Sequence, residues 1–158
     1  MPKFASVVPD VCITTDGSST GRVGAGGWSA ILVYGTHEKE IFGYFEENVT
    51  NQRMELYAVV QALKTLKRSC NVRIISDSEY VVEGIKTRLG QWVKKGWRTN
   101  AGNEPAHRDL WEEVLALQKM HNIEAVWERG HNGHAGNERA DRLARTARTQ
   151  RHASSPAA

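Results

Sequence analysis

The sequence has few cysteines and no long hydrophobic run. Only two of its 158 residues are cysteines, Cys12 and Cys70, and they show no CxxC spacing. This argues against a disulfide framework and fits a reducing compartment. No apolar run approaches membrane-spanning length, and the N-terminal MPKFASVVPD has no signal-peptide apolar core. We therefore expect a soluble, cytoplasmic protein that has no membrane partner.

Two common ligand-binding patterns are also missing. The glycines at 24, 26 and 27 do not form a dinucleotide fingerprint, because the GxGxxG spacing would require glycine at Ser29. We interpret them as turn glycines. A zinc site built from His131 and His134 lacks further well-spaced cysteine or histidine ligands. The chemistry must come from other residue types.

The composition is that of a globular chain, with 40% hydrophobic and 25% charged residues, and its length fits one domain. The net charge is only +3, but the positive charges are unevenly placed. Between Lys86 and Arg98 there are five basic residues and no acidic one: Lys86, Arg88, Lys94, Lys95 and Arg98. This segment fits a polyanionic partner, and the alternative is an ordinary solvated face.

Hydrophobic periodicity predicts an α/β protein that starts with antiparallel hairpins. Runs rich in β-branched and aromatic residues predict strands at 11–16, 28–34, 39–45, 71–76 and 123–127. Helical spacing predicts a helix from the cap Thr50 to about Lys67, one or two turns over 78–85, a helix opened by Pro105 with Met120 inside, and a last helix through Asp141. The alternation predicts that Asp16 and Asp77 end neighbouring parallel strands, where ligands bind in open α/β sheets.

Four acidic residues lie at the ends of predicted strands or at the margins of apolar helix faces: Asp16, Glu55, Asp77 and Asp141. A half-buried carboxylate is costly unless a cation compensates it, and a hard divalent metal is the natural partner. Each acid also has an ordinary interpretation. Glu55 could pair with Arg53 or Lys64, Asp77 could cap a helix, Asp141 could pair with Arg145, and Asp16 could be a turn residue.

The contexts of these acids are TDGS, RMEL, SDS and GHNGHAGNERAD. In this order the sequence resembles type 1 ribonuclease H, in its bacterial form, over residues 10–148. The resemblance implies the ribonuclease H-like fold, a mixed five-stranded sheet flanked by helices on both faces. It also implies an endonuclease that hydrolyses the RNA strand of RNA–DNA hybrids. On this interpretation residues 1–9 are an extension, 10–148 the catalytic domain and 149–158 a disordered tail.

The resemblance also implies roles for individual residues. Two Mg²⁺ ions, with Mn²⁺ as an alternative, would balance the four carboxylates, with Asp16 bridging both ions, Glu55 and Asp77 on one side, and Asp141 on the other. Such a site activates the attacking water and stabilises the departing ribose oxygen, which leaves 5′-phosphate and 3′-hydroxyl ends. The family's loop histidine, here His131, assists proton transfer or product departure.

The expected substrate surface has two parts. The segment with Trp92, Lys94, Lys95, Trp97 and Arg98 resembles the basic protrusion of the bacterial enzymes, and it combines flat apolar surface with phosphate-neutralising charge. Trp92 is equally interpretable as core, and Trp97 is the better exposed candidate.

By the same resemblance, Asn51 and Gln52 read the RNA strand, and Thr50 lies near a DNA phosphate. Two positions depart from the bacterial pattern, since Arg22-Val23 stands where Asn-Pro is frequent and Glu79 where glutamine is common. The alternatives are a non-catalytic hybrid-binding module and a DNA nuclease of related fold. We expect a monomer.

Overall fold

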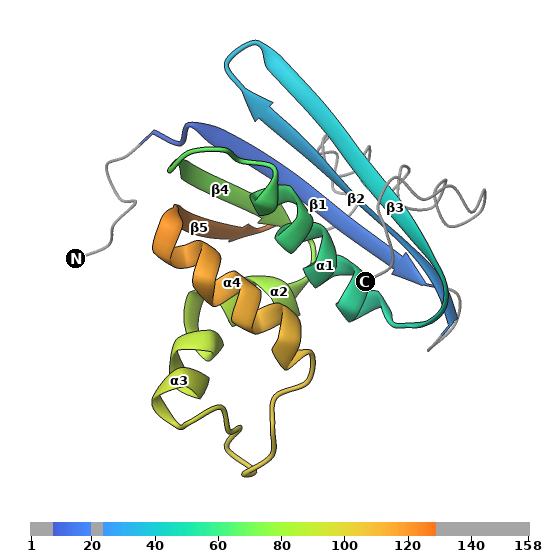
Figure 1. Ribbon diagram of the computed structural model, residues 1–158, viewed down its shortest axis with the longest axis vertical. Helices are drawn as coiled ribbons and strands as arrows, with labels where there is room; N and C mark the ends of the chain where they lie inside the picture. The colour runs from blue at the N-terminus through green and yellow to red at the C-terminus, as the bar shows by residue number, and fades with distance from the viewer. Residues whose placement is uncertain (1–7, 20–23, 129–158) are drawn as a thin grey trace.

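The computed structural model describes residues 8–19 and 24–128. Its strands are β1 (Val11–Ser19), β2 (Gly24–Tyr34), β3 (His37–Val49), β4 (Asn71–Ser76) and β5 (Asn122–Trp127). They form one sheet in the order β3-β2-β1-β4-β5 (Figure 1). The first three strands are antiparallel neighbours, whereas β4 runs parallel to β1 and β5 parallel to β4. The predicted mixed five-stranded sheet is confirmed.

The glycine cluster lies inside a strand, so its interpretation as a turn is wrong. β2 begins at Gly24, and its pairing with β3 shifts register between Gly24 and Gly26. A Cβ on Gly26 would lie 2.5 Å from Cγ2 of Val49 and 2.9 Å from the carbonyl oxygen of Ser18. Glycine is therefore needed at position 26, because Val49 and the backbone of Ser18 lie too close to β2 to leave room for a side chain.

Helix α1 (Asn51–Lys64) begins as predicted but ends earlier. The Thr50 hydroxyl accepts a hydrogen bond from the backbone N–H of Arg53 at 3.1 Å, which caps the helix. The helix ends at Lys64 rather than near Lys67, because the Thr65 hydroxyl donates to the carbonyl of Ala62 at 2.7 Å and closes the last turn. The predicted apolar face, including Leu56, is buried in the core.

The second helical region is longer than predicted. Helix α2 (Glu79–Glu83) continues into a π-helical turn, η1 (Gly84–Arg88), and then into α3 (Leu89–Lys94). Gly84 is buried at the start of η1, where a Cβ would lie 2.1 Å from Cη2 of Trp111. The missing side chain at position 84 is what lets the Trp111 indole occupy the core, where it is 0% exposed.

Gly84→Ala should therefore destabilise the protein strongly. The added methyl group would overlap the Trp111 ring, and relieving overlap in a packed core typically costs about 1–3 kcal/mol. Chemical denaturation of the variant should show this loss in the free energy of unfolding. Gly90→Ala is the matched control, because nothing lies within 4 Å of a Cβ built at Gly90. A Gly84→Ala variant as stable as Gly90→Ala would contradict the packing described here.

Helix α4 (Arg108–Met120) differs from its prediction at both ends. It begins at Arg108, not at Pro105, because His107 interrupts the chain with a positive φ of 58°. Leu110, Trp111 and Val114 are buried as expected, but Met120 is 53% exposed, so its placement inside was wrong. Met120 is the last residue of the helix, where the chain already turns away toward β5.

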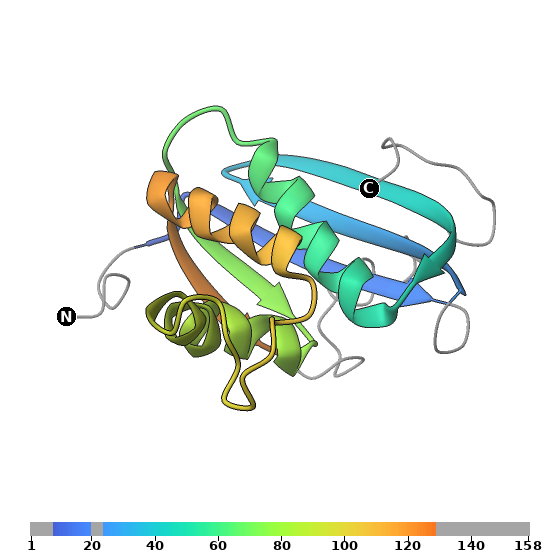
Figure 2. The ribbon, with the colours of Figure 1, turned by 60° about the horizontal axis from the view of Figure 1, so that its bottom comes forward.

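The described helices and the sheet form two layers. α1 and α4 lie side by side across one face of the sheet (Figure 2), and the core fills the space between them and β1, β2 and β4. The predicted last helix with Asp141, the loop before it with His131, and the predicted tail at 149–158 lie outside the described residues. No helix in the described part of the chain is long and apolar enough to cross a membrane.

Candidate metal centre

Two of the predicted ligands come from neighbouring parallel strands. β1 pairs with β4 up to Thr14 and Ile75, and Asp77 directly follows the last residue of β4. Asp16 lies within β1, because this strand continues to Ser19 alongside β2 alone. The prediction that Asp16 ends its strand is therefore wrong, although the parallel neighbourhood of the two strands is confirmed. Asp16 is only 3% exposed.

The third carboxylate comes from α1, and Gly17 lets that helix approach the strand. A Cβ on Gly17 would lie 2.4 Å from the backbone nitrogen of Glu55 and 2.5 Å from the carbonyl carbon of Met54. Any side chain at position 17 would push α1 away from β1. The glycine next to Asp16 in TDG is the sequence signal for this close approach, and the sequence interpretation missed it.

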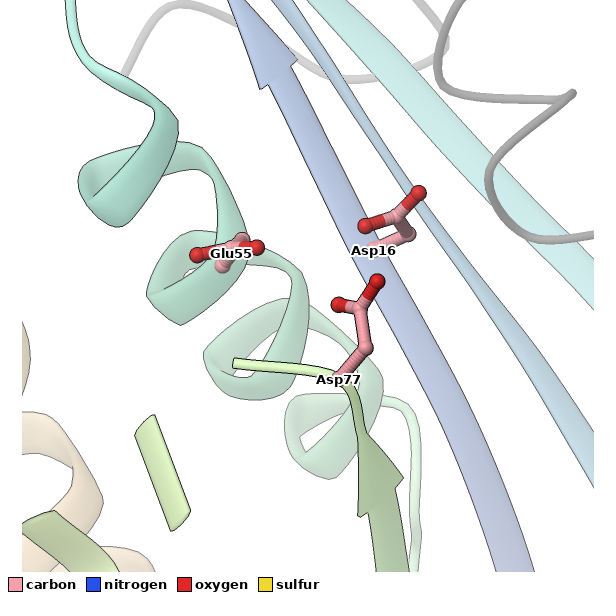
Figure 3. Close-up of side chains that lie close together, drawn as sticks. All are labelled: Asp16, Glu55 and Asp77. Atoms are coloured by element: carbon pink, nitrogen blue, oxygen red, sulfur yellow. The ribbon is translucent and has the colours of Figure 1, made fainter. Parts of the chain in front are cut away.

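The three side chains converge. Asp16, Glu55 and Asp77 each offer one carboxylate oxygen, and these oxygens lie within 4.8 Å of one another (Figure 3). The site is therefore assembled from β1, α1 and the residue after β4. Asp141, the fourth predicted ligand, and His131 lie outside the described residues, so their placement stays a prediction.

Burial makes the charge of this cluster costly. The pKa of Glu55 is raised from its ordinary value of 4.5 to about 7, first by desolvation and also by the charge of Asp77, while a hydrogen bond from Ser78 lowers it. Ser78 is 8% exposed, and its hydroxyl also accepts from the Val81 N–H at 3.2 Å. Ser78, not Asp77, is thus the N-cap of α2. The interpretation of Asp77 as a cap is wrong.

The ordinary interpretation of Glu55 as an ion-pair partner fails as well. Arg53 pairs with Asp109, and Lys64 pairs with Glu113, both on α4. The cluster instead has the donor set that hard divalent cations prefer, carboxylate oxygens alone. A cation there would relieve the desolvation and repulsion that raise the pKa of Glu55. The residues present therefore fit a metal site.

A tryptophan that the sequence interpretation did not consider fixes the main chain at Asp77. The Trp127 indole N–H donates to the carbonyl oxygen of Asp77 at 3.1 Å, and the Glu128 N–H donates to Ser76 at 2.9 Å. These bonds hold the end of β4 against the end of β5. The position of Trp127 at the end of a predicted strand was the available signal.

Comparison with known proteins identifies the family. The sequence model described as RNase H matches residues 9–149. The chain belongs to the ribonuclease H family. It is 50% identical over 123 residues to a ribonuclease H of Cupriavidus pinatubonensis, covering 78% of this chain and 84% of that one. To a ribonuclease HI of Neisseria meningitidis it is 47% identical over 121 residues, covering 77% and 83%.

Two solved structures align with this chain. The structure of LC9-RNase H1, described as a type 1 enzyme with the type 2 active-site motif, aligns with a TM-score of 0.81 and 29% identity over 94% of this chain and 76% of that one. The foamy viral protease-reverse transcriptase in complex with an RNA/DNA hybrid aligns with a TM-score of 0.72 and 25% identity, over 90% of this chain and 20% of that one. The predicted enzyme class, a nuclease of the ribonuclease H type, is confirmed.

The polar residues expected to read substrate lie at the start of α1 in this ribonuclease H. Asn51 and Gln52 are exposed in the first turn, directly before the segment that carries Glu55. The Asn51 side-chain oxygen accepts from the Ser19 backbone N–H at 2.6 Å and from its hydroxyl at 3.0 Å. Asn51 therefore also ties the end of β1 to α1. Thr50 caps the helix, as described above.

The basic segment of this ribonuclease H runs from η1 through α3 into the following loop. Its five cationic residues, Lys86, Arg88, Lys94, Lys95 and Arg98, are exposed. Trp92 and Trp97 are both partly buried against the core. The Trp92 ring lies 5.6 Å from that of Trp111, and the Arg108 guanidinium lies 5.0 Å above the ring of Trp97. Trp97 is therefore partly buried like Trp92, and its place as the better exposed of the two stays a prediction.

Proposed function

We propose that this chain is an endoribonuclease that hydrolyses the RNA strand of RNA–DNA hybrids with two divalent ions, leaving 5′-phosphate and 3′-hydroxyl ends. The observation that carries the proposal is the convergence of Asp16, Glu55 and Asp77 in a partly buried cluster. Separate elements bring three carboxylates together, although desolvation disfavours the ionised form of Glu55 and raises its pKa. Such a costly arrangement favours a catalytic site over a module that only binds the hybrid.

Mg²⁺ is the ion we propose, with Mn²⁺ as the alternative, and Asp16, Glu55, Asp77 and Asp141 would hold it. When bound, a pair of such ions supplies the Lewis-acid stabilisation of the attacking and departing oxygens that phosphodiester hydrolysis requires. The protein's part is to hold the carboxylates in place, so that they present the oxygen-only donor set that hard cations prefer. His131 would move a proton or assist product departure.

Substrate recognition is proposed for two surfaces. Asn51 and Gln52, exposed next to the cluster, would contact the RNA strand through groove atoms and 2′-hydroxyls, which distinguish RNA from DNA. Thr50 would lie near a phosphate of the DNA strand. The basic segment, with Lys94, Lys95 and Arg98 exposed around Trp92 and Trp97, would neutralise backbone phosphates.

We also propose that residues 10–148 form the catalytic domain, that the segments 1–9 and 149–158 lie outside it, and that the protein works as a cytoplasmic monomer. The family model matches 9–149, which agrees with the first of these.

A cleavage assay with three substrates tests the function. End-labelled RNA–DNA hybrid, DNA duplex and RNA duplex are incubated with the protein and Mg²⁺ or Mn²⁺, with and without a chelator. The expected result is metal-dependent loss of RNA from the hybrid alone, with fragments that carry 5′-phosphates and 3′-hydroxyls by enzymatic end analysis. Equal cleavage of the DNA duplex, or no cleavage with either metal, would refute the proposal.

A further inference from the structure

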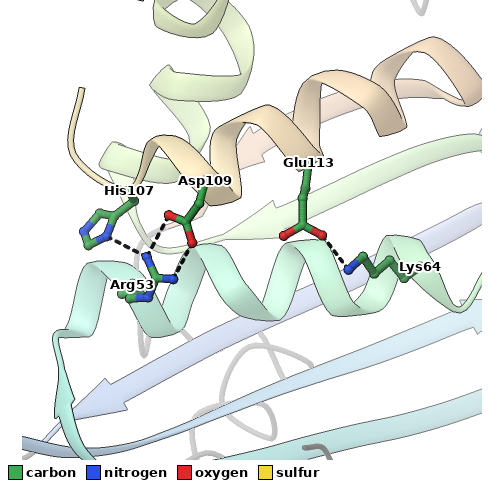
Figure 4. A network of polar contacts seen from close by, with 5 residues as sticks. All are labelled: Arg53, Lys64, His107, Asp109 and Glu113. Atoms are coloured by element: carbon green, nitrogen blue, oxygen red, sulfur yellow. Dashed lines mark hydrogen bonds and ion pairs between the residues drawn. The ribbon is translucent and has the colours of Figure 1, made fainter. Parts of the chain in front are cut away.

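An arginine near the metal cluster is held by a different helix. Both oxygens of Asp109 accept from the Arg53 guanidinium, at 3.2 Å and 2.7 Å, and one guanidinium nitrogen lies 3.3 Å from Nδ1 of His107 (Figure 4). Arg53 belongs to the first turns of α1, whereas His107 and Asp109 belong to the start of α4. We call these three residues the α1–α4 junction.

The junction has the geometry of a specific clamp rather than of a loose surface pair. A bidentate arginine–carboxylate contact fixes distance and orientation together. The Arg53 side chain is only 22% exposed, and its backbone N–H donates to the cap Thr50. Asp109 also lies in the first turn of α4, where its charge offsets the repulsion between the helix N-terminus and a guanidinium.

The same junction also contacts α2, the helix that follows Asp77. The ring of His107 lies 6.2 Å from that of Tyr80, edge to face, and the Tyr80 hydroxyl accepts from the Trp111 indole N–H at 2.9 Å. Tyr80 is in α2, three residues after Asp77. The helix that carries Glu55 and the helix that follows Asp77 are therefore both in contact with α4.

We propose that Arg53 is a positioning residue, which acts through Asp109 and His107 to hold the first turns of α1 at the distance from α4 that places Glu55 in the metal cluster. This inference rests on the proposed metal-dependent function. It predicts that loss of the two Arg53–Asp109 hydrogen bonds displaces Glu55, which lies two residues further along α1. The affinity for metal should therefore fall more than the affinity for substrate.

The chain offers a matched control. Lys64 and Glu113 form a second ion pair between the same two helices, at 2.5 Å, but at the far end of α1 and with side chains 50% and 39% exposed (Figure 4). A bridge that merely stabilises the packing of α1 on α4 would lower the stability of the protein without a selective loss of Mg²⁺ affinity. The positioning role predicts that selective loss for Arg53 and not for Lys64.

The test compares Arg53→Met, which keeps the aliphatic stem, with Asp109→Asn, which keeps the shape, and with Lys64→Met. Mg²⁺ affinity is measured by calorimetric titration without substrate, and kcat and KM are measured on a hybrid at saturating Mg²⁺. Arg53→Met and Asp109→Asn should each weaken Mg²⁺ binding and lower kcat by about tenfold, the effect typical of residues that orient metal ligands. KM should stay within about twofold, and Lys64→Met should match the wild type in all three quantities.

The double variant Arg53→Met/Asp109→Asn should be no worse than either single variant, because both break one interaction. Additive losses, or an unchanged Mg²⁺ affinity in Asp109→Asn, would overturn the inference. If Arg53→Met does not fold, Asp109→Asn carries the test. If the wild-type protein binds Mg²⁺ but does not cleave hybrids, the proposed function is refuted. If the wild type is active and the two single variants show normal Mg²⁺ affinity and kcat, only the positioning role is refuted.

Discussion

Asp16→Asn should abolish cleavage of hybrids while leaving their binding largely intact. Asp16 is 3% exposed and shares the cluster with Glu55 and Asp77, so the neutral amide removes one negative charge from the proposed metal site without changing its shape. Divalent ions supply several kcal/mol of transition-state stabilisation, and their loss corresponds to a fall in kcat of roughly 10³-fold or more. The phosphate contacts proposed for the exposed basic segment would not depend on this carboxylate.

Single-turnover kinetics and fluorescence anisotropy on one labelled hybrid give both quantities. Glu79→Gln is the control, because it removes a negative charge from an exposed position two residues after Asp77 and should retain turnover. Asp16→Asn with more than about a tenth of wild-type turnover would contradict a catalytic metal at this site.

Glu55→Gln should stabilise the metal-free protein at alkaline pH while it abolishes activity. The folded-state pKa of Glu55, about 7, lies above its ordinary value of 4.5, so the ionised form is disfavoured in the folded protein. Stability from this group is therefore complete below pH 4.5 and falls as the pH rises through 7. A shift of this size corresponds to about 3 kcal/mol, which the neutral glutamine should recover at pH 8.

Denaturation with a chelator at pH 4 and pH 8 measures this difference. The variant should gain stability at pH 8 and almost none at pH 4, and Mg²⁺ at pH 8 should raise the melting temperature of the wild type more than that of the variant. Glu79→Gln should leave stability unchanged at both pH values because the side chain is exposed. If Glu55→Gln and the wild type are equally stable at pH 8, burial and the charge of Asp77 do not raise the pKa of Glu55 in the folded protein.

Local sequence patterns were sufficient for much of the architecture. β-Branched runs predicted the five strands, and the cap Thr50 with its apolar stripe predicted the start of α1. The boundaries that failed depend on distant contacts. Gly24–Gly27 belong to a strand because β2 pairs with β3 as far as Val49, and α4 starts after His107, which lies against Arg53 of α1. Periodicity within a segment contains no information about either partner.

The sequence by itself was enough to predict the family and to single out four carboxylates as candidate metal ligands, because the four motifs occur in the order typical of that family and carboxylate oxygens suit hard cations. Only the tertiary structure decided that three of them meet, through the close approach of α1 at Gly17, and that burial raises the pKa of Glu55. It also assigned Arg53 to Asp109, 56 residues away, rather than to Glu55. Distance and desolvation arise from packing between segments, so no local pattern can specify them.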